Sequence, residues 1–266
     1  MNILSSLRYL VALSEHKHFG RAALACHITQ PALSNALRAL EAEFDVVIVH
    51  RGRTFSGLTP EGERVLASAQ HMLHEHQLLQ QSLKSTADRP AGEISIGAVP
   101  TAVPIAARFA AMLQARHPGI LPSVLSLSSS ELETRLNSLS IDLALGYTQR
   151  MGSSDVKLRA LPQYTEHYFL LRRAATPHAE ELQVGDAITW QEASGYPLCL
   201  LTPEMHNRAI VNEAFALMSP QIRTPIGFMA HAQVRPSRCM QAALDMAQDG
   251  HWLRHVAMNT GLLVSL

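Results

Sequence analysis

The segment from Thr29 to Arg38 carries the side chains with the most specific recognition chemistry in this sequence. Thr29 followed by Gln30 and Pro31 is typical of a helix N-terminus, because threonine caps unpaired amide groups and proline in the first turn sacrifices no hydrogen bond. The free amide groups of such an N-terminus suit a phosphate. Gln30, and Asn35 one turn later, carry carboxamides that can pair bidentately with adenine in the major groove. The pattern therefore predicts a helix that reads duplex DNA.

Hydroxyl and basic side chains around this helix extend the expected DNA surface. Ser34 and Arg38 lie on its polar face, within reach of phosphates. Arg51 and Arg53 lie in a turn beyond the helix, where they can enter the minor groove or hold the DNA backbone. The predicted DNA-contacting residues are Thr29, Gln30, Pro31, Ser34, Asn35, Arg38, Arg51 and Arg53.

Three helices and a hairpin must position these side chains. The spacing of apolar residues predicts helices over 3–15, over 19–25 and from Thr29 to about Phe44. The apolar run Val46–Val49 and the turn residues that follow it predict a hairpin whose return strand lies around Leu58. Short helix, tight turn, capped helix and hairpin together indicate a winged helix-turn-helix.

A long helix is expected from Pro60 to about Ser85, with Thr59 as its cap. Apolar residues recur along it with the alternating spacing of a coiled coil. This seam, which we expect to pair copies of the chain, consists of Val65, Ala69, Met72, His76, Leu79 and Leu83. We interpret His76 as a tolerated interface residue rather than a pH sensor.

A breaker-rich segment over 86–92 separates the long helix from a part of the chain with a different pattern. Strands and helices alternate there, which predicts an α/β fold with a parallel sheet and crossover helices. The expected strands are 94–97, 124–127, 142–146, 168–171 and 198–201, and the expected helices are 105–116, 131–139 and 208–217.

Composition and sequence patterns argue against several classes of function. The 22 basic and 22 acidic residues cancel, so DNA binding must depend on a local surface. No apolar stretch is long enough for a membrane span, and the N-terminus lacks the pattern of a signal peptide, so we expect no membrane partner and a cytoplasmic protein. The spacing of cysteines and histidines predicts no metal or other cofactor. No catalytic motif is found, and we expect no enzyme.

The N-terminal part of the sequence resembles a known protein family. The residues that carry the resemblance are Phe19–Leu24, Gln30–Ser34, Leu40–Glu41, Arg51 and Leu58–Gly62, and they are similar to the DNA-binding domain of LysR-type transcriptional regulators. The resemblance implies a winged helix-turn-helix over 1–59, a dimerising linker helix over 60–88 and an effector-binding domain over 92–266. It implies two α/β subdomains in that last domain, as in periplasmic binding proteins, and a homodimer or homotetramer on double-stranded operator DNA.

The resemblance also implies where a small-molecule effector binds, namely in a cleft near the carboxyl ends of strands. Hydroxyls and free amide groups at such positions suit a small anion or a carboxylate, which is the effector class that we expect. The corresponding residues are Thr101, Ser128, Ser129, Thr148 and Thr202. The alternative is that they are ordinary helix caps and turn formers.

The sequence departs from the family pattern in three places. Lys17 and His18 replace small residues, and Asp45 stands in the wing where glycine is preferred. From about Ile226 the pattern is lost, and we interpret the tail as frameshifted or truncated, so that the effector domain is incomplete at its C-terminus. The alternative is a divergent native tail, in which 237–248 forms a capped helix.

Three alternatives compete with a DNA-binding regulator. The first is an enzyme, but the sequence contains no motif that would support one. The second is a solute-binding protein, but the sequence lacks the expected signal peptide, and this function would leave the N-terminal third unexplained. The third is a truncated regulator that binds DNA but no longer senses an effector. If the chain is a DNA-binding regulator, we expect its effector to shift the population between two arrangements of the two effector subdomains. This shift would change how far the bound DNA is bent.

Overall fold

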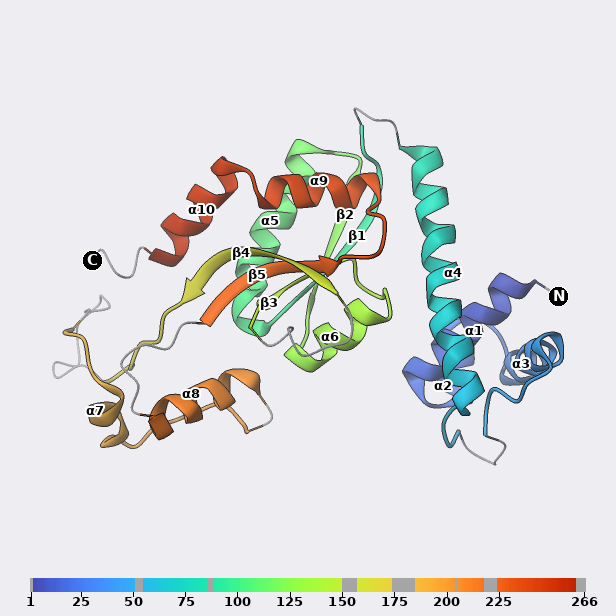
Figure 1. Cartoon of the computed structure of the whole chain (residues 1–266), viewed down its shortest axis with the longest axis horizontal. Helices are drawn as coiled ribbons and strands as arrows, with labels where there is room; N and C mark the ends of the chain where they lie inside the picture. Colours follow the sequence, from blue (N-terminus) through green and yellow to red (C-terminus); the bar gives the residue numbers. More distant parts are fainter. Residues whose placement is uncertain are drawn as a thin grey trace. The chain divides into compact units, whose positions relative to one another are not determined.

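The computed structural model describes residues 2–50, 55–85, 89–149, 157–173, 185–203, 205–217 and 224–261. The described chain divides into two compact units, one made essentially of residues 1–84 and the other of nearly all the rest (Figure 1). Each unit has its own hydrophobic core.

The first unit consists of four helices that match the predicted ones closely. They are α1 (Ile3–His16), α2 (Phe19–Ala25), α3 (Gln30–Phe44) and α4 (Pro60–Lys84). The predicted cap is confirmed, because the Thr29 hydroxyl accepts a hydrogen bond from the amide of Ala32 at 3.4 Å. Leucines of α1 and α3 form the centre of the core, and Ala22 and Ala23 of α2 let these helices approach closely. The buried leucines are Leu7, Leu10, Leu13, Leu33, Leu37 and Leu40.

The predicted hairpin is reduced to a single antiparallel bridge between Val49 and Leu58. The strand expected over Val46–Val49 was therefore wrong. A side-chain carboxylate takes the place of part of the expected hydrogen bonding between strands. Glu41 Oε1 accepts hydrogen bonds from the amides of Ile48 at 2.9 Å and Val49 at 3.3 Å. Backbone amides satisfied by a side chain need no strand partner. Arg51 and Arg53, predicted at the tip of this hairpin, lie outside the described residues.

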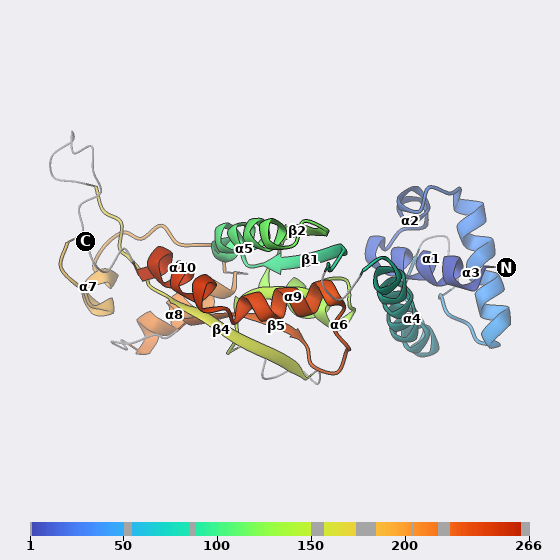
Figure 2. The ribbon, with the colours of Figure 1, turned by 90° about the horizontal axis from the view of Figure 1, so that it is seen from above.

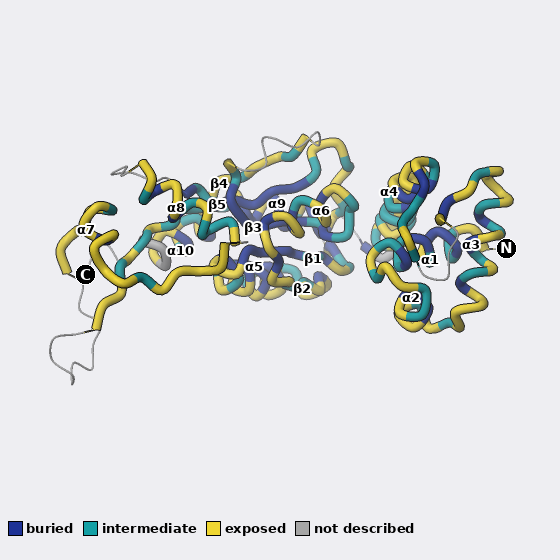
Figure 3. The backbone as a smooth tube through the Cα atoms, turned by 90° about the horizontal axis from the view of Figure 1, so that it is seen from below, coloured by how far each residue is buried: buried dark blue, intermediate teal, exposed yellow. Residues whose placement is uncertain are grey.

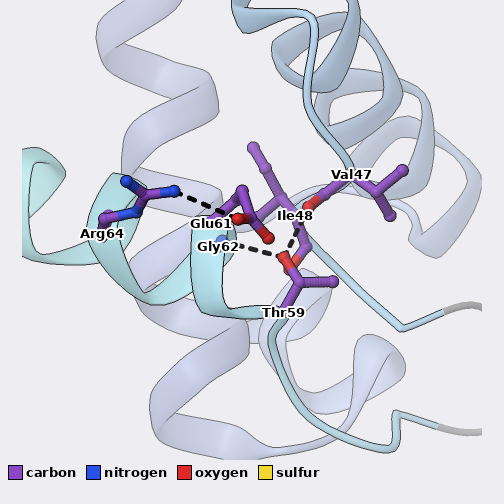
Figure 4. Close-up of polar contacts among 6 residues, drawn as sticks. All are labelled: Val47, Ile48, Thr59, Glu61, Gly62 and Arg64. Carbon is purple, nitrogen blue, oxygen red and sulfur yellow. Dashed lines mark hydrogen bonds and ion pairs between the residues drawn. The ribbon is translucent and has the colours of Figure 1, made fainter.

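The start of α4 is fixed to the same segment by Thr59 (Figure 4). The Thr59 hydroxyl donates to the carbonyl of Val47 at 2.5 Å and accepts from the amide of Gly62 at 2.9 Å. A Cβ atom at Gly62 would lie 2.1 Å from the carbonyl oxygen of Ile48, which only glycine avoids. Threonine and glycine at these two positions therefore seat the long helix on the wing segment.

The second unit is built on one five-stranded mixed sheet with the order β2-β1-β3-β5-β4 (Figures 1 and 2). The strands are β1 (Gly92–Ala98), β2 (Ile120–Ser126), β3 (Leu143–Tyr147), β4 (Leu158–Glu166) and β5 (Thr224–His231). The first three are parallel, which confirms the predicted crossover pattern. Strand β5 runs antiparallel to both β3 and β4, so β4 points in the same direction as β3.

Helices cover both faces of this sheet. Helices α5 (Val103–Arg116), α9 (Arg238–Ala247) and α10 (Gly250–Gly261) lie on one face, and α6 (Ser129–Asn137) lies on the other. A 3-10 turn, η1 (Pro100–Ala102), follows β1. The two remaining helices, α7 (Trp190–Ser194) and α8 (His206–Leu217), follow β4 along the chain.

Two expected strands are absent, and two strands, β4 and β5, were not expected. Residues 168–171 and 198–201 are not strands, and Leu171 and Leu201 are exposed. A strand needs a hydrogen-bonded neighbour, and within the described residues every named strand belongs to the single sheet. Strand β4 was not predicted because it contains Pro162, and proline is rare within strands. The structure tolerates Pro162 because it lies at a β-bulge on an edge strand.

The segment after residue 224 is part of the core of the second unit. Strand β5 lies between β3 and β4, and its Phe228 contacts Phe109 of α5 with ring centroids 4.4 Å apart. Trp252 of α10 is 1% exposed and meets Phe109 edge-on at 4.9 Å. Figure 3 shows β5 as mainly buried tube, and six of the ten residues of α9 are buried. The capped helix expected over 237–248 corresponds to α9, whose N-cap is Ser237. That the tail arose by frameshift or truncation stays a prediction.

Candidate DNA interface and effector site

The predicted DNA-contacting side chains of α3 lie on one accessible face of the helix. Gln30, Pro31, Asn35 and Arg38 are exposed and Ser34 is half-buried. The opposite face holds the buried leucines of the core. Positions three and four apart share a helix face, so these side chains form a continuous stripe that begins at the capped N-terminus. We call this stripe the α3 surface.

Two of the side chains on the α3 surface hold each other. Arg38 Nη1 donates to Asn35 Oδ1 at 3.3 Å, and both residues are exposed. This contact leaves the Asn35 amide nitrogen able to donate to a base or a phosphate. The guanidinium keeps four further N–H donors for a phosphate, because arginine has five in all.

The residues that depart from the family pattern before α2 have local structural roles. His18 is the N-cap of α2, and its Nδ1 accepts from the amides of Gly20 at 3.1 Å and Arg21 at 3.3 Å. Lys17 closes α1 in a left-handed conformation with φ of 50°. Sequence reasoning missed the cap, because histidine is not among the residues that usually occupy this position.

The predicted seam of α4 divides into two parts. Ala69 is fully buried and Val65 packs against the core of the first unit, where α4 contacts α1. Further along the helix, Met72, Leu79 and Leu83 are 43%, 57% and 78% exposed, and His76 is half-buried. The first part of the seam therefore stabilises the single chain, and the second part presents an apolar stripe.

The topology of the sheet brings three chain segments to one edge of the second unit. Strands β1, β3 and β4 point the same way, so their carboxyl ends meet there. Thr101 follows β1, Tyr147 ends β3 and Glu166 ends β4. The Thr101 hydroxyl donates to Glu166 Oε1 at 2.6 Å, and the Tyr147 hydroxyl donates to Glu166 Oε2 at 2.9 Å.

The first turn of α8 completes this arrangement. Asn207 Nδ2 donates to the Tyr147 hydroxyl oxygen at 3.0 Å, and the ring of His206 lies 5.1 Å from the Tyr147 ring. The backbone carbonyl of Glu166 accepts from the buried Thr224 hydroxyl at 3.1 Å, which fixes the end of β4. We call the set Thr101, Tyr147, Glu166, His206 and Asn207 the carboxyl-edge site.

Burial, and after it the charge of Glu166, raises the pKa of three tyrosines near the carboxyl-edge site. Burial raises the pKa of Tyr168 to about 12, and the negative charge of Glu166 contributes to the same shift. Burial and then Glu166 also raise the pKa of Tyr147 and of Tyr164. These phenols therefore stay protonated at neutral pH, so the Tyr147 hydroxyl remains a donor to Glu166.

Of the five predicted effector residues, only Thr101 joins the carboxyl-edge site. Ser128 instead caps α6, where its hydroxyl and amide both donate to Glu131 at 2.8 Å and lower the pKa of that carboxyl. The Thr148 hydroxyl donates to the carbonyl of Pro225 at 3.3 Å. Ser129 is buried in the first turn of α6, and Thr202 is exposed after 198–201.

Sequence reasoning missed four members of the carboxyl-edge site. Tyr147 directly follows the strand expected over 142–146, and a polar residue at such a strand end is the signal that could have identified it. Glu166 gave no such signal, because β4 was not predicted. His206 and Asn207 lie just before the helix predicted over 208–217, and no sequence pattern indicates that this segment lies close to β3.

Comparison with known families assigns both units. Residues 4–63 match the family described as bacterial regulatory helix-turn-helix proteins of the lysR family. Residues 87–234, more than half of the chain, match the LysR substrate-binding domain. The chain belongs to the LysR family. The resemblance seen in the sequence is confirmed, and so is the combination of an N-terminal helix-turn-helix with a substrate-binding domain on a mixed α/β sheet.

Individual relatives in the LysR family are similar to this chain over only part of their own length. A hydrogen peroxide-inducible genes activator of Pectobacterium carotovorum is 33% identical over 146 residues, which are 54% of this chain and 48% of that protein. The probable HTH-type transcriptional regulator LrrA of Synechococcus elongatus is 29% identical over 201 residues, 75% of this chain and 65% of that protein. The chain thus spans about half the length of the first of these relatives.

Solved structures of LysR-family proteins share the fold. A full-length OxyR variant from Pseudomonas aeruginosa superimposes with a TM-score of 0.63 at 19% identity, covering 96% of this chain and 94% of that one. A hydrogen-peroxide-bound OxyR mutant from Corynebacterium glutamicum gives 0.52 at 18% identity, covering 98% and 94%. Among the described residues of the present chain, no helix has the length and apolar character to cross a membrane, and no three potential metal ligands cluster.

Proposed function

We propose that this LysR-family chain is a cytoplasmic transcriptional regulator that binds operator DNA through the α3 surface and responds to a small molecule at the carboxyl-edge site. The observation that carries the proposal is the α3 surface itself. It joins a capped helix N-terminus, an exposed glutamine and an arginine–asparagine pair on one face of a rigidly packed helix. A helix so equipped fits the major groove, where carboxamides read adenine and the arginine holds a phosphate.

The proposed regulator acts by binding rather than by catalysis. An effector that favours one arrangement of the second unit shifts the population of DNA-binding arrangements, because each arrangement has its own affinity for the effector. The family match over 87–234 supports a sensing regulator over a chain that only binds DNA. It likewise supports a regulator over an enzyme.

Gln30→Ala should weaken binding to a specific operator by about 1–3 kcal/mol, because it removes a bidentate base contact. The operator is first selected from random duplexes with the full chain, and affinities are then measured by fluorescence anisotropy. Non-specific DNA serves as the second substrate and should be bound almost as before. Gln77→Ala, an exposed glutamine on α4, is the matched control. Equal losses on both kinds of DNA would show that Gln30 reads no base.

We also propose that two copies of the chain pair through the apolar stripe of α4. Residues 1–60 contain only a small excess of basic over acidic side chains, so one copy neutralises few phosphates. Two copies on one operator supply the affinity that a single copy lacks. The stripe formed by Met72, Leu79 and Leu83 is accessible in the single chain and has coiled-coil spacing.

The double substitution Leu79→Glu and Leu83→Glu should convert the pair to a monomer at micromolar concentration. Both side chains are exposed in the single chain, so the fold should survive while the pairing surface gains two charges. Light scattering after size-exclusion chromatography measures the mass. Gln80→Glu adds a charge on the same helix outside the stripe and should leave the mass unchanged. A double variant that keeps the wild-type mass would contradict pairing through α4.

A further inference from the structure

The carboxyl-edge site holds a carboxylate at the position where the sequence predicted an anionic effector. Thr101, a predicted effector residue, and Tyr147 are natural donors for such an effector, because Thr101 follows β1 and Tyr147 ends β3. Both hydroxyls already donate to Glu166, at 2.6 and 2.9 Å. A second carboxylate bound there would face the first at short range, with its donors engaged and a like charge beside it.

Glu166 also lacks a positive partner within the described chain. Its carboxylate oxygens have two hydroxyl partners, and none of the described lysine, arginine or histidine side chains forms an ion pair with it. An ionised carboxylate accepts up to about four hydrogen bonds, so roughly two positions remain open. The Thr101 end of the site is exposed, which leaves these positions approachable from solvent.

The groups around the carboxylate also suit a cation. The half-buried His206 ring and the Tyr147 ring meet at 66°, edge to face, beside the hydroxyl that contacts Glu166. Aromatic faces attract cations through their quadrupole. Asn207 of α8 donates to the Tyr147 hydroxyl. A ligand that binds Glu166 therefore lies beside residues of both β4 and α8, which are far apart in the chain.

We propose that the carboxyl-edge site selects a small organic cation, a protonated primary amine, and that Glu166 is the residue that sets this specificity. This inference rests on the proposed function, because it names the ligand class of the same effector site. The amine donates to the open positions of Glu166, and Thr101 and Tyr147 hold the carboxylate in place. Small carboxylates are rejected by the same charge.

The test compares amines with carboxylates of similar size on the full chain. Benzylamine, tyramine and putrescine form one arm, and benzoate, 4-hydroxyphenylacetate and succinate form the other. Isothermal titration calorimetry at neutral pH should detect at least one amine and none of the carboxylates. Glu166→Gln should weaken that amine about tenfold or more, because it removes the charge and keeps the shape. Glu213→Gln, an exposed carboxylate of α8, is the matched control and should bind as the wild type does.

Three results would overturn the inference: no amine binds, a carboxylate binds the wild-type chain, or Glu166→Gln binds the amine unchanged. If Glu166→Gln does not fold, Tyr147→Phe takes its place, because it keeps the ring and removes the hydroxyl that holds Oε2. It should weaken the amine, and unchanged binding would count against the inference in the same way. DNA binding by the ligand-free wild type is measured in parallel, so a failure of the proposed function is seen separately from a failure of ligand selectivity.

Discussion

Trp252→Ala should lower the free energy of unfolding of the second unit by about 3–5 kcal/mol. The indole is 1% exposed and touches aromatic rings of α5 and β5, so its removal leaves a cavity between elements that are far apart in the chain. Its Nε1 also donates to Gln163 Oε1 of β4 at 2.5 Å, and that partner would lose its donor. The effect is large because one side chain joins three elements.

Urea unfolding followed by far-ultraviolet circular dichroism measures this change. The transition of the first unit should not move, because no described residue of that unit packs in this core. Met258→Ala removes a large apolar side chain from an exposed position of the same helix and should cost less than about 0.5 kcal/mol. A loss for Trp252→Ala as small as that of the control would mean that α10 is not packed on the sheet in solution.

Gly62→Ala should destabilise the first unit by about 1–3 kcal/mol and reduce DNA binding with it. The added methyl group would meet the carbonyl oxygen of Ile48 at 2.1 Å, a backbone atom that cannot turn away as a side chain can. Either α4 or the wing segment must shift, and the contact of the Gly62 amide with Thr59 is weakened. Both segments carry residues that we expect to act on DNA or in pairing.

Thermal unfolding of the full chain and anisotropy with the selected operator measure the two effects together. Gly250→Ala is the matched control, since a Cβ there has no neighbour closer than 3.6 Å and the residue opens a helix. It should be neutral or slightly stabilising. A Gly62→Ala chain with wild-type stability would show that the close approach of α4 to Ile48 relaxes at no cost.

The sequence predicted well wherever structure depends on residues close together in the chain. The bounds of α2 and α3, the Thr29 cap and the α3 surface follow from helical spacing and capping chemistry, both of which act within a few residues. The parallel order of β1, β2 and β3 was predictable because short crossovers allow few alternatives. The family assignment depends on these same local motifs.

Long-range contacts explain what was missed. The wing lost its predicted strand because Glu41 satisfies amides that a ladder would otherwise need. Strand β4 was overlooked because an edge position and a bulge let it tolerate Pro162. The expected strands at 168–171 and 198–201 had the right composition but no neighbour with which to pair.

The sequence by itself determined the helix that we expect to enter DNA, the long helix behind it and the family. Only the tertiary structure placed Glu166 against Thr101, 65 residues away, and Trp252 in the core beside Phe109. Periodicity and capping report forces between near neighbours, whereas the meeting of strand ends depends on sheet order and direction, which are set by packing of the whole unit. The chemistry of the effector site is for this reason a property of the fold rather than of any one motif.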